Sequence, residues 1–451
     1  MSLGKQGGRN GKMFLAWDEI PKSPGHVFYD RLQTILCKAG FDRFVEDLCS
    51  PYYATKQGRP SIPPGRYFRM HLVGYFEGID SERGIQWRCA DSLSLQEFLL
   101  LDTGQAVPDH SSLSRIRTRL PLELHQEVFT WVLGVITEAG LVQGDRIGVD
   151  SSTMEANAAM RTIIRKDTGE DYRQMLQRLA EESGMQTPTN DDLSRMDRKR
   201  EGKKLSNTDW ESPTDPEAKI ARMKDGRTRL AYKPEHAVDL DTGAVVAVEV
   251  HSADKGDTKT LGETLDKTKA NLDAVGLAPT PNDPSELGND RGYFSRQIIK
   301  ELDGGPWKTR IAEPKRKGLN WWNGDHDARR AVYNNRVRLG TGKGKDLAKR
   351  RTEFCERSFQ HCLDRGGMRR TWLRGRKNVE KRYLLHVAGF NLGLLMRHLT
   401  GHGTPKGLAD VWDIIFLSFG SHNRAILLVL AVHKDNSHLW LPLAAIGMGL
   451  G

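Results

Sequence analysis

The chain has 451 residues, with 68 Lys and Arg against 58 Asp and Glu, and a formal net charge of +10. Its 38% hydrophobic and 28% charged residues are typical of a globular protein of two or three domains and exclude an intrinsically disordered one. It lacks an apolar run of about 18 residues and an apolar signal-peptide core, so we expect a cytoplasmic protein without a membrane span. The five cysteines are never spaced as CxxC, which disfavours a disulfide scaffold or a zinc module.

The N-terminal region, residues 1–142, is predicted to be helical. Apolar residues recur at helical spacing in residues 68–79 and again in residues 124–136. The second of these helices is expected to begin at Pro121 and to stop at Gly140, because proline suits the first turn and glycine the end of a helix.

A basic helix is predicted between these two, in residues 107–120. Asp109 or Ser111 would cap its N-terminus. Arg115 and Arg117 on this helix are candidate contacts to a phosphate backbone, since a helix start also offers free N–H groups. An ordinary capped surface helix is an equally good interpretation of the same residues.

Beyond the helical region the pattern becomes mixed. A short apolar run at residues 146–152 predicts a strand that ends near Asp150, and residues 231–252 predict two strands around the turn DLDTG. Between them, the polar stretch 160–210 predicts a mobile insertion with one amphipathic helix at residues 172–182. The remaining predicted elements are a helix at 261–272, a strand at 285–290 leading into a helix, a strand at 308–314, a basic connection, and helices at 346–363 and 383–399. This order predicts an α/β fold with a mixed sheet flanked by helices.

The excess positive charge is concentrated in one stretch. Residues 315–382 contain 21 Lys and Arg against 7 Asp and Glu, with Trp321, Trp322 and Trp372 interleaved. A solvated helical face is one interpretation. Arginine and lysine also bind phosphates, and aromatic rings stack on unpaired bases, so nucleic acid is the favoured partner. The candidate DNA contacts in this stretch are Lys315, Arg316, Arg369, Arg370, Arg374 and Arg376.

Three acidic residues stand where chemistry is plausible. Asp150 ends a predicted strand, Asp290 lies at a strand–turn–helix junction, and Glu356 lies in a predicted helix. Each alone is weak evidence, because an aspartate at a strand end is commonly a turn former or a helix cap. Together, three converging carboxylates would form a site for two hard cations such as Mg²⁺, which prefer oxygen ligands.

The chain resembles the DDE transposases of bacterial insertion sequences from about Tyr29 to Gly407. The resemblance rests on the order and spacing of VPDHSSLSRIRTRL, GVDSSTMEANA, NDRGYFS and CERSFQHCLDRGGMRRTWLRGRK. It implies an N-terminal all-α domain (1–142) that binds DNA ends, and an RNase H-like catalytic domain (143–400) with a polar helical insertion at about 157–228 and another insertion at 315–345. The tail, residues 401–451, departs from the pattern and receives no role.

The resemblance also implies the reaction. The first Asp of the family maps to Asp150, the second to Asp290 and the Glu to Glu356, which would bind Mg²⁺, with Mn²⁺ as a substitute. The expected activity is cleavage and strand transfer at the terminal inverted repeats of an insertion sequence. The expected partner is double-stranded DNA, bound by a homodimer associated with the nucleoid. Arg291, beside Asp290, could hold a phosphate.

Several assignments have alternatives. Glu356 is preferred over Glu353 because the Glu-x-x-Phe pattern of the family is met by Glu356 and Phe359. Many relatives carry a basic residue where this chain has Leu363, and Arg365 or Arg369 could replace it. A catalytically inactive or domesticated DNA-binding derivative, and an RNase H-like nuclease that cuts without joining, are the alternative functions.

A second group of residues is interpreted as structural. We expect Ser151, Ser152 and Tyr293 to support the acids and not to act as nucleophiles. Tyr232, Lys233, His236 and Asp239 receive the same interpretation, although His236 could lie near the metal ions.

Overall fold

The computed structural model describes residues 27–54, 61–102, 104–201, 205–315, 322 and 324–407. Arg316 and most of the C-terminal tail lie outside these residues. Among the described residues, no helix is both long enough and apolar enough to cross a membrane.

The N-terminal region is helical, as predicted. Pro121 stands at the N-cap of the helix that ends at Glu138, and Gly140 follows with a φ of 73°. Asp109 caps the basic helix by accepting a hydrogen bond from the Ser111 N–H, which decides between the two predicted caps. The helices are α1 (Val27–Lys38), α2 (Phe41–Cys49), α3 (Pro64–Phe76), α4 (Glu82–Ala90), α5 (Leu93–Phe98), α6 (His110–Arg119) and α7 (Leu122–Glu138).

A mixed sheet forms the centre of the molecule. Its strands are ordered β7–β6–β1–β8–β9, with β6 antiparallel to both β7 and β1, and with β1, β8 and β9 parallel to one another. This is the arrangement expected of an RNase H-like sheet, so the predicted fold class is confirmed. The strands are β1 (Arg146–Ser151), β6 (Thr228–Asp239), β7 (Val245–Ser252), β8 (Ser285–Asn289) and β9 (Trp307–Ile311), with β2 (Met154–Glu155) and β5 (Lys219–Arg222) paired to the first half of β6.

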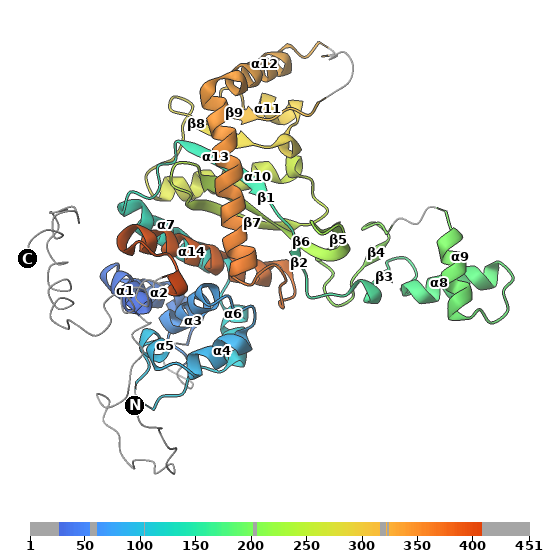
Figure 1. Ribbon diagram of the computed structural model, residues 1–451, viewed down its shortest axis with the longest axis horizontal. Helices are drawn as coiled ribbons and strands as arrows, with labels where there is room; N and C mark the ends of the chain where they lie inside the picture. The colour runs from blue at the N-terminus through green and yellow to red at the C-terminus, as the bar shows by residue number, and fades with distance from the viewer. Residues whose placement is uncertain are drawn as a thin grey trace, which may run out of the picture.

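Helices cover both faces of the sheet (Figure 1). On one face lies α10 (Asp257–Ala274), whose Thr260 and Thr264 donate hydrogen bonds to Glu235 of β6. On the other lies the long helix α13 (Gly342–Phe359), whose Cys355 packs on the Gly148 carbonyl of β1. Side chains alternate between the faces of a strand, so α13 covers the face that carries Asp150 and α10 covers the opposite face.

Helix α14 (Arg376–Thr400) joins the sheet to the N-terminal helices. Its middle is buried on all sides, as expected for a central helix. Asn391 bonds both the N–H and the carbonyl of Val245 in β7, while Arg382 contacts the ring of His71 in α3. Helix α7 also shares an apolar core with β1. The predicted boundary at residue 142 is therefore not a gap in the packing.

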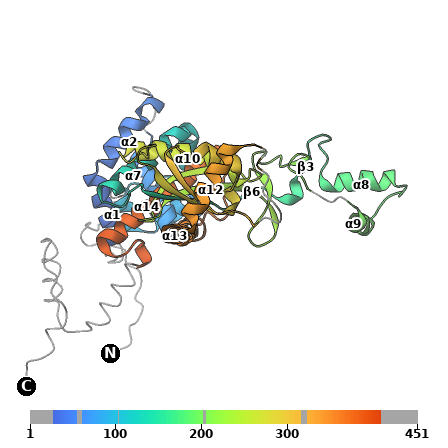
Figure 2. The ribbon, with the colours of Figure 1, turned by 90° about the horizontal axis from the view of Figure 1, so that it is seen from above.

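The insertion after β2 differs from its prediction. Helix α8 (Tyr172–Glu182) is confirmed, but a second helix, α9 (Asn190–Lys199), packs against it, and the short strands β3 (Ile164–Arg165) and β4 (Trp210–Glu211) form the base. A capping box between Thr189 and Asp192 starts α9 and was the overlooked sequence signal. This α8–α9 arm projects away from the rest of the molecule in both views (Figures 1 and 2).

The basic connection before residue 346 was also mispredicted. Helix α11 (Arg296–Leu302) follows β8, and residues 326–340 form helix α12 (His326–Gly340). Helix α13 then begins at Gly342 and ends in a π-helical turn, Gln360–Arg365. The apolar stripe of α12 is narrow, with only Ala328, Ala331, Val332 and Asn335 buried, so its periodicity is hidden among charged residues.

The buried Glu380 of α14 faces Glu249, a half-buried glutamate of β7. Burial, followed by the negative charge of Glu249, raises the pKa of Glu380 to about 8 from an ordinary 4.5, against the lowering effects of Arg376 and Lys267. Burial also raises the pKa of Glu249. The folded protein therefore keeps a proton on Glu380 at neutral pH, whereas the unfolded chain releases it.

We predict that E380Q makes the protein more stable at about pH 8, with the gain shrinking toward about pH 5. Because the folded pKa is raised, stability is lost as the pH rises from 4.5 to about 8, and the neutral amide removes that loss. Thermal unfolding midpoints across this range provide the measurement. The control is E127Q at an exposed position of α7, and equal shifts in both variants would contradict the prediction.

Candidate active site

Two of the predicted acids lie side by side at the ends of neighbouring strands. Gly148 of β1 pairs with Gly288 of β8, and the parallel register continued by two residues places Asp150 beside Asp290. Asp290 caps the short 3₁₀ turn Arg291–Tyr293, and its Oδ1 accepts a hydrogen bond from the Gly292 N–H at 2.8 Å. The fold therefore brings together two carboxylates that are 140 residues apart in the chain.

Asp150 is a partly exposed carboxylate that lies among other charged groups. Burial raises the pKa of Asp150, and the negative charge of Asp290 raises it further, while Arg351 and Lys224 lower it. Arg351 of α13 supplies the counter-charge directly, with its Nη1 at 2.8 Å from Asp150 Oδ2. A Cβ atom at Gly148 would lie 3.1 Å from Arg351 Cγ, so this glycine leaves room for the arginine on the sheet.

The third acid, Glu356, lies on α13 over the same part of β1. Its neighbour Cys355 points onto the sheet, and the charges of both Asp150 and Glu356 raise the pKa of the Cys355 thiol, although burial raises it most. Glu356 itself is exposed, whereas Glu353 is engaged with Arg357 at 2.5 Å on the helix surface. Within the described parts of the chain, no three His, Cys, Asp or Glu side chains are grouped closely enough to hold a metal ion.

A buried polar layer supports the two aspartates from the α10 side. The Tyr293 hydroxyl donates to Glu235 at 2.7 Å, and the Ser151 hydroxyl donates to Asp257 at 3.0 Å. Lys233 pairs with Asp257 at 2.7 Å. Ser151 and Tyr293 are thus held in hydrogen bonds, in keeping with their predicted supporting role. Glu235 and Asp257 were not predicted, although the polar alternation at 233 and 235 in a strand was a usable signal.

His236 is a structural residue. It is fully buried, and its ring stacks on Phe359 with 4.1 Å between centroids. Its Nδ1 lies 2.8 Å from the Ser358 hydroxyl and its Nε2 2.8 Å from the Tyr383 hydroxyl, so both nitrogens are occupied. Burial lowers the pKa of His236 to about 3, which keeps the ring neutral. No ring nitrogen remains to bind a metal ion.

The residues predicted to contact DNA differ in how exposed their side chains are. Arg115, Arg291 and Lys315 are exposed, and Arg291 adjoins Asp290. The prediction that Arg117 contacts DNA is wrong. Its side chain is only 8% exposed, and its guanidinium donates to Glu82 in the interior of the helical region. Arg316 lies outside the described residues.

Of the arginines after α13, Arg369 and Arg370 contact the segment that follows Asp150, Arg369 at Ser152 and Arg370 at Glu155. Residues 369–371 pair with β2, through hydrogen bonds from the Glu155 N–H to the Arg369 carbonyl and from the Thr371 N–H to the Glu155 carbonyl, both at 2.9 Å. Arg370 and Arg374 are exposed beside this pairing. Arg376 instead donates to the Val250 carbonyl at 3.3 Å, which ties it to β7.

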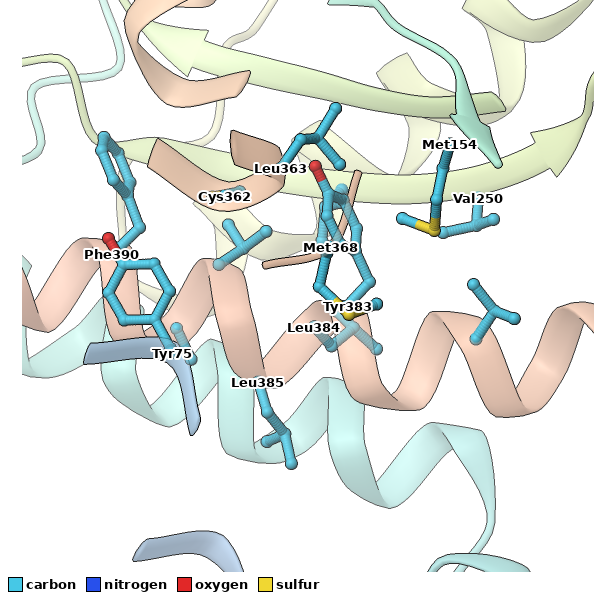
Figure 3. Close-up of a cluster of buried hydrophobic side chains, with 14 of the residues drawn as sticks. Tyr75, Met154, Val250, Cys362, Leu363, Met368, Tyr383, Leu384, Leu385 and Phe390 are labelled. Carbon is cyan, nitrogen blue, oxygen red and sulfur yellow. The ribbon is translucent and has the colours of Figure 1, made fainter. Parts of the chain in front are cut away.

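Leu363 takes no part in DNA binding. It is fully buried in the π-helical turn, and Figure 3 shows it with Met368 and Tyr383 in an apolar cluster between the sheet and α14. Of the two proposed replacements, Arg365 is exposed, whereas Arg369 is paired with Asp364 at 2.8 Å.

Comparison with protein families agrees with this architecture. Residues 18–119 match the family described as "Transposase domain (DUF772)", and residues 205–392 match the family described as "Transposase DDE domain". The second range contains Asp290 and Glu356, whereas Asp150 lies between the two ranges. No curated protein and no solved structure matches the chain.

The two matched ranges occupy more than half of the chain, in the order helical domain and then catalytic domain. The second range includes most of the RNase H-like sheet at whose edge Asp150 and Asp290 meet. The chain belongs to the DDE transposases, the enzymes that move insertion sequences.

Proposed function

We propose that this transposase cleaves DNA at the terminal inverted repeats of its insertion sequence and joins the freed ends to target DNA. The observation that supports this most directly is the position of Asp150 beside Asp290, at the ends of the parallel strands β1 and β8, on the face of the sheet covered by the helix that carries Glu356. In the first step, water attacks the phosphorus at the element end and the 3′-oxygen leaves as a hydroxyl. In the second, that hydroxyl attacks a phosphodiester of the target and displaces its 3′-oxygen.

DDE transposases depend on divalent metal ions. We propose that Asp150, Asp290 and Glu356 hold Mg²⁺, or Mn²⁺ in its place. Their carboxylate oxygens are the donors that such hard cations prefer. When bound, the cations stabilise the attacking and leaving oxygens of an in-line displacement at phosphorus. The ion pair between Asp150 and Arg351 supports the choice of Asp150, because it shows that this carboxylate already binds a positively charged group.

The other residues of the site orient the acids and the DNA. The Gly292 N–H holds the Asp290 carboxylate, and Tyr293 anchors the same turn on Glu235. Arg291 projects beside Asp290 and is suited to bind a phosphate. The remaining proposed contacts to DNA are Arg115, Lys315, Arg316, Arg369, Arg370 and Arg374. We propose a homodimer on the nucleoid, because two element ends must be paired.

We predict that D150A, D290A and E356A each abolish cleavage and joining while leaving end binding within a few-fold of wild type. Each removes a carboxylate from the reacting centre, whereas E353A removes one that is paired with Arg357 on the surface and should retain activity. The measurement is a gel assay with DNA carrying the element ends, in Mg²⁺, Mn²⁺ or EDTA.

The same assay separates the alternatives. Activity in E356A together with its loss in E353A would show that the glutamate is misassigned. Metal-dependent nicks without joined products identify a nuclease. Binding without cleavage in either metal identifies an inactive DNA-binding derivative.

We further predict that R351Q raises the affinity for Mn²⁺ by roughly fivefold, measured by titration calorimetry without DNA. The guanidinium both repels a cation and occupies an oxygen of Asp150, and an ion pair of this kind is worth about 1 kcal/mol. R350Q is the matched control, since Arg350 pairs with Asp346 and Asp241 away from the acids. Weaker Mn²⁺ binding by R351Q would instead show that Arg351 orients Asp150 for the metal ion.

A further inference from the structure

Two adjacent cavities lie at the edge of β2. They have volumes of about 460 and 340 Å³, and both are lined by Glu155 and Arg229. The larger also includes Arg370 and Arg374, and the smaller includes Lys224 and Arg369. Together they form a groove, named here the β2 groove, between the β5–β6 turn and the segment that pairs with β2.

One end of the β2 groove lies next to the segment that follows Asp150. Thr153, three residues after Asp150, lines the smaller cavity, and Arg369 of the same cavity lies 3.3 Å from the Ser152 hydroxyl and 3.3 Å from the Thr153 carbonyl. The larger cavity extends to residues 157–162, at the base of the α8–α9 arm. A chain-like ligand in this groove would therefore run directly from the reacting centre toward the arm.

The β2 groove carries a net positive charge that two carboxylates offset only in part. Five basic residues line it, against Glu155 and Asp225. Glu155 contacts the Arg229 guanidinium closely and lies 3.8 Å from that of Arg370, while Asp225 lies 3.3 Å from Arg229. The Glu155 carboxylate thus lies between two arginines from opposite walls of the groove. It occupies the position in which a phosphate group would bind both of them.

We propose that the β2 groove binds the backbone of a single DNA strand next to the scissile phosphate, and that Glu155 competes with this strand for Arg229 and Arg370. The inference rests on the proposed function for the identity of the strand. Cavities of these volumes match small-ligand pockets and not a channel for a double helix.

An aromatic residue at the edge of the groove agrees with a single strand. Trp372 is 46% exposed, and the Arg370 guanidinium stacks over its ring at 4.6 Å. Its indole N–H donates to Asp80 at 2.7 Å, which fixes the ring. A fixed, half-exposed aromatic face beside phosphate-binding arginines suits the stacking of an unpaired base.

The test is the affinity of the full-length protein for a short fluorescent single-stranded oligonucleotide, measured by anisotropy over a range of salt concentrations in EDTA. E155Q is expected to bind about 3- to 10-fold more tightly, because it releases two arginines, and its salt dependence should become steeper. R229Q and R374Q should each bind more weakly and lower the slope of log K against log salt by about 0.7.

The controls are one Glu→Gln and one Arg→Gln substitution at exposed positions of the α8–α9 arm. Glu182 is 58% exposed and Arg195 is 74% exposed, so E182Q and R195Q should bind like wild type. Unchanged or weaker binding by E155Q, together with wild-type binding by R374Q, would overturn the proposal. Effects confined to a duplex probe would overturn the assignment to a single strand.

The assay also separates this inference from the proposed function. Because it is performed in EDTA, a protein that fails to cleave DNA can still show the predicted changes in binding. A protein that cleaves and joins normally, but whose groove variants bind single strands like wild type, rejects the β2 groove alone.

Discussion

The parallel pairing of β1 with β8 is the constraint on which the site depends. It places Asp150 beside Asp290 at one strand end, where burial, and then the negative charge of Asp290, raise the pKa of Asp150. Such an arrangement is stable only with positive charge nearby, and the described structure provides it through Arg351. The same need for positive charge supports our proposal that divalent cations bind at these strand ends.

The two faces of the sheet contribute different residues around Asp150 and Asp290. The α13 face presents the acids and Arg351, and it is otherwise closed by Cys355, Phe359 and the neutral ring of His236. The α10 face holds the acids in place from behind, through Tyr293 on Glu235 and Ser151 on Asp257. A buried glutamate that accepts several hydrogen bonds is costly unless every partner is present, so this layer specifies one geometry.

The helical region is attached to the catalytic sheet by packing and not by a linker. Helix α14 contacts β7 through Asn391 and α3 through Arg382, and α7 contributes to the core beneath β1. DNA bound at α6 and DNA at the acids would therefore be held by one continuous body. The β2 groove lies on this body between the acids and the α8–α9 arm, where a strand leaving the site would pass.

Short-range patterns in the sequence were sufficient for most elements. Helix α7 from Pro121, strand β1 and the β6–β7 hairpin depend on neighbouring residues, and the mixed sheet follows from their order. The acids were found by motif, and their role as metal ligands stays a prediction. Helices α9 and α12 were missed because their buried stripes are narrow and their surroundings charged.

Only the tertiary structure decided which side chains are exposed to bind DNA and which charged groups pair with each other. Arg117 and Leu363 stand in stretches that resemble DNA-binding segments, yet both are buried by contacts with distant parts of the chain. Arg351 meets Asp150 across 201 residues, and Arg370 reaches Glu155 because residues 369–371 pair with β2. Local periodicity carries no information about such pairings, since they are set by how the helices pack on the sheet.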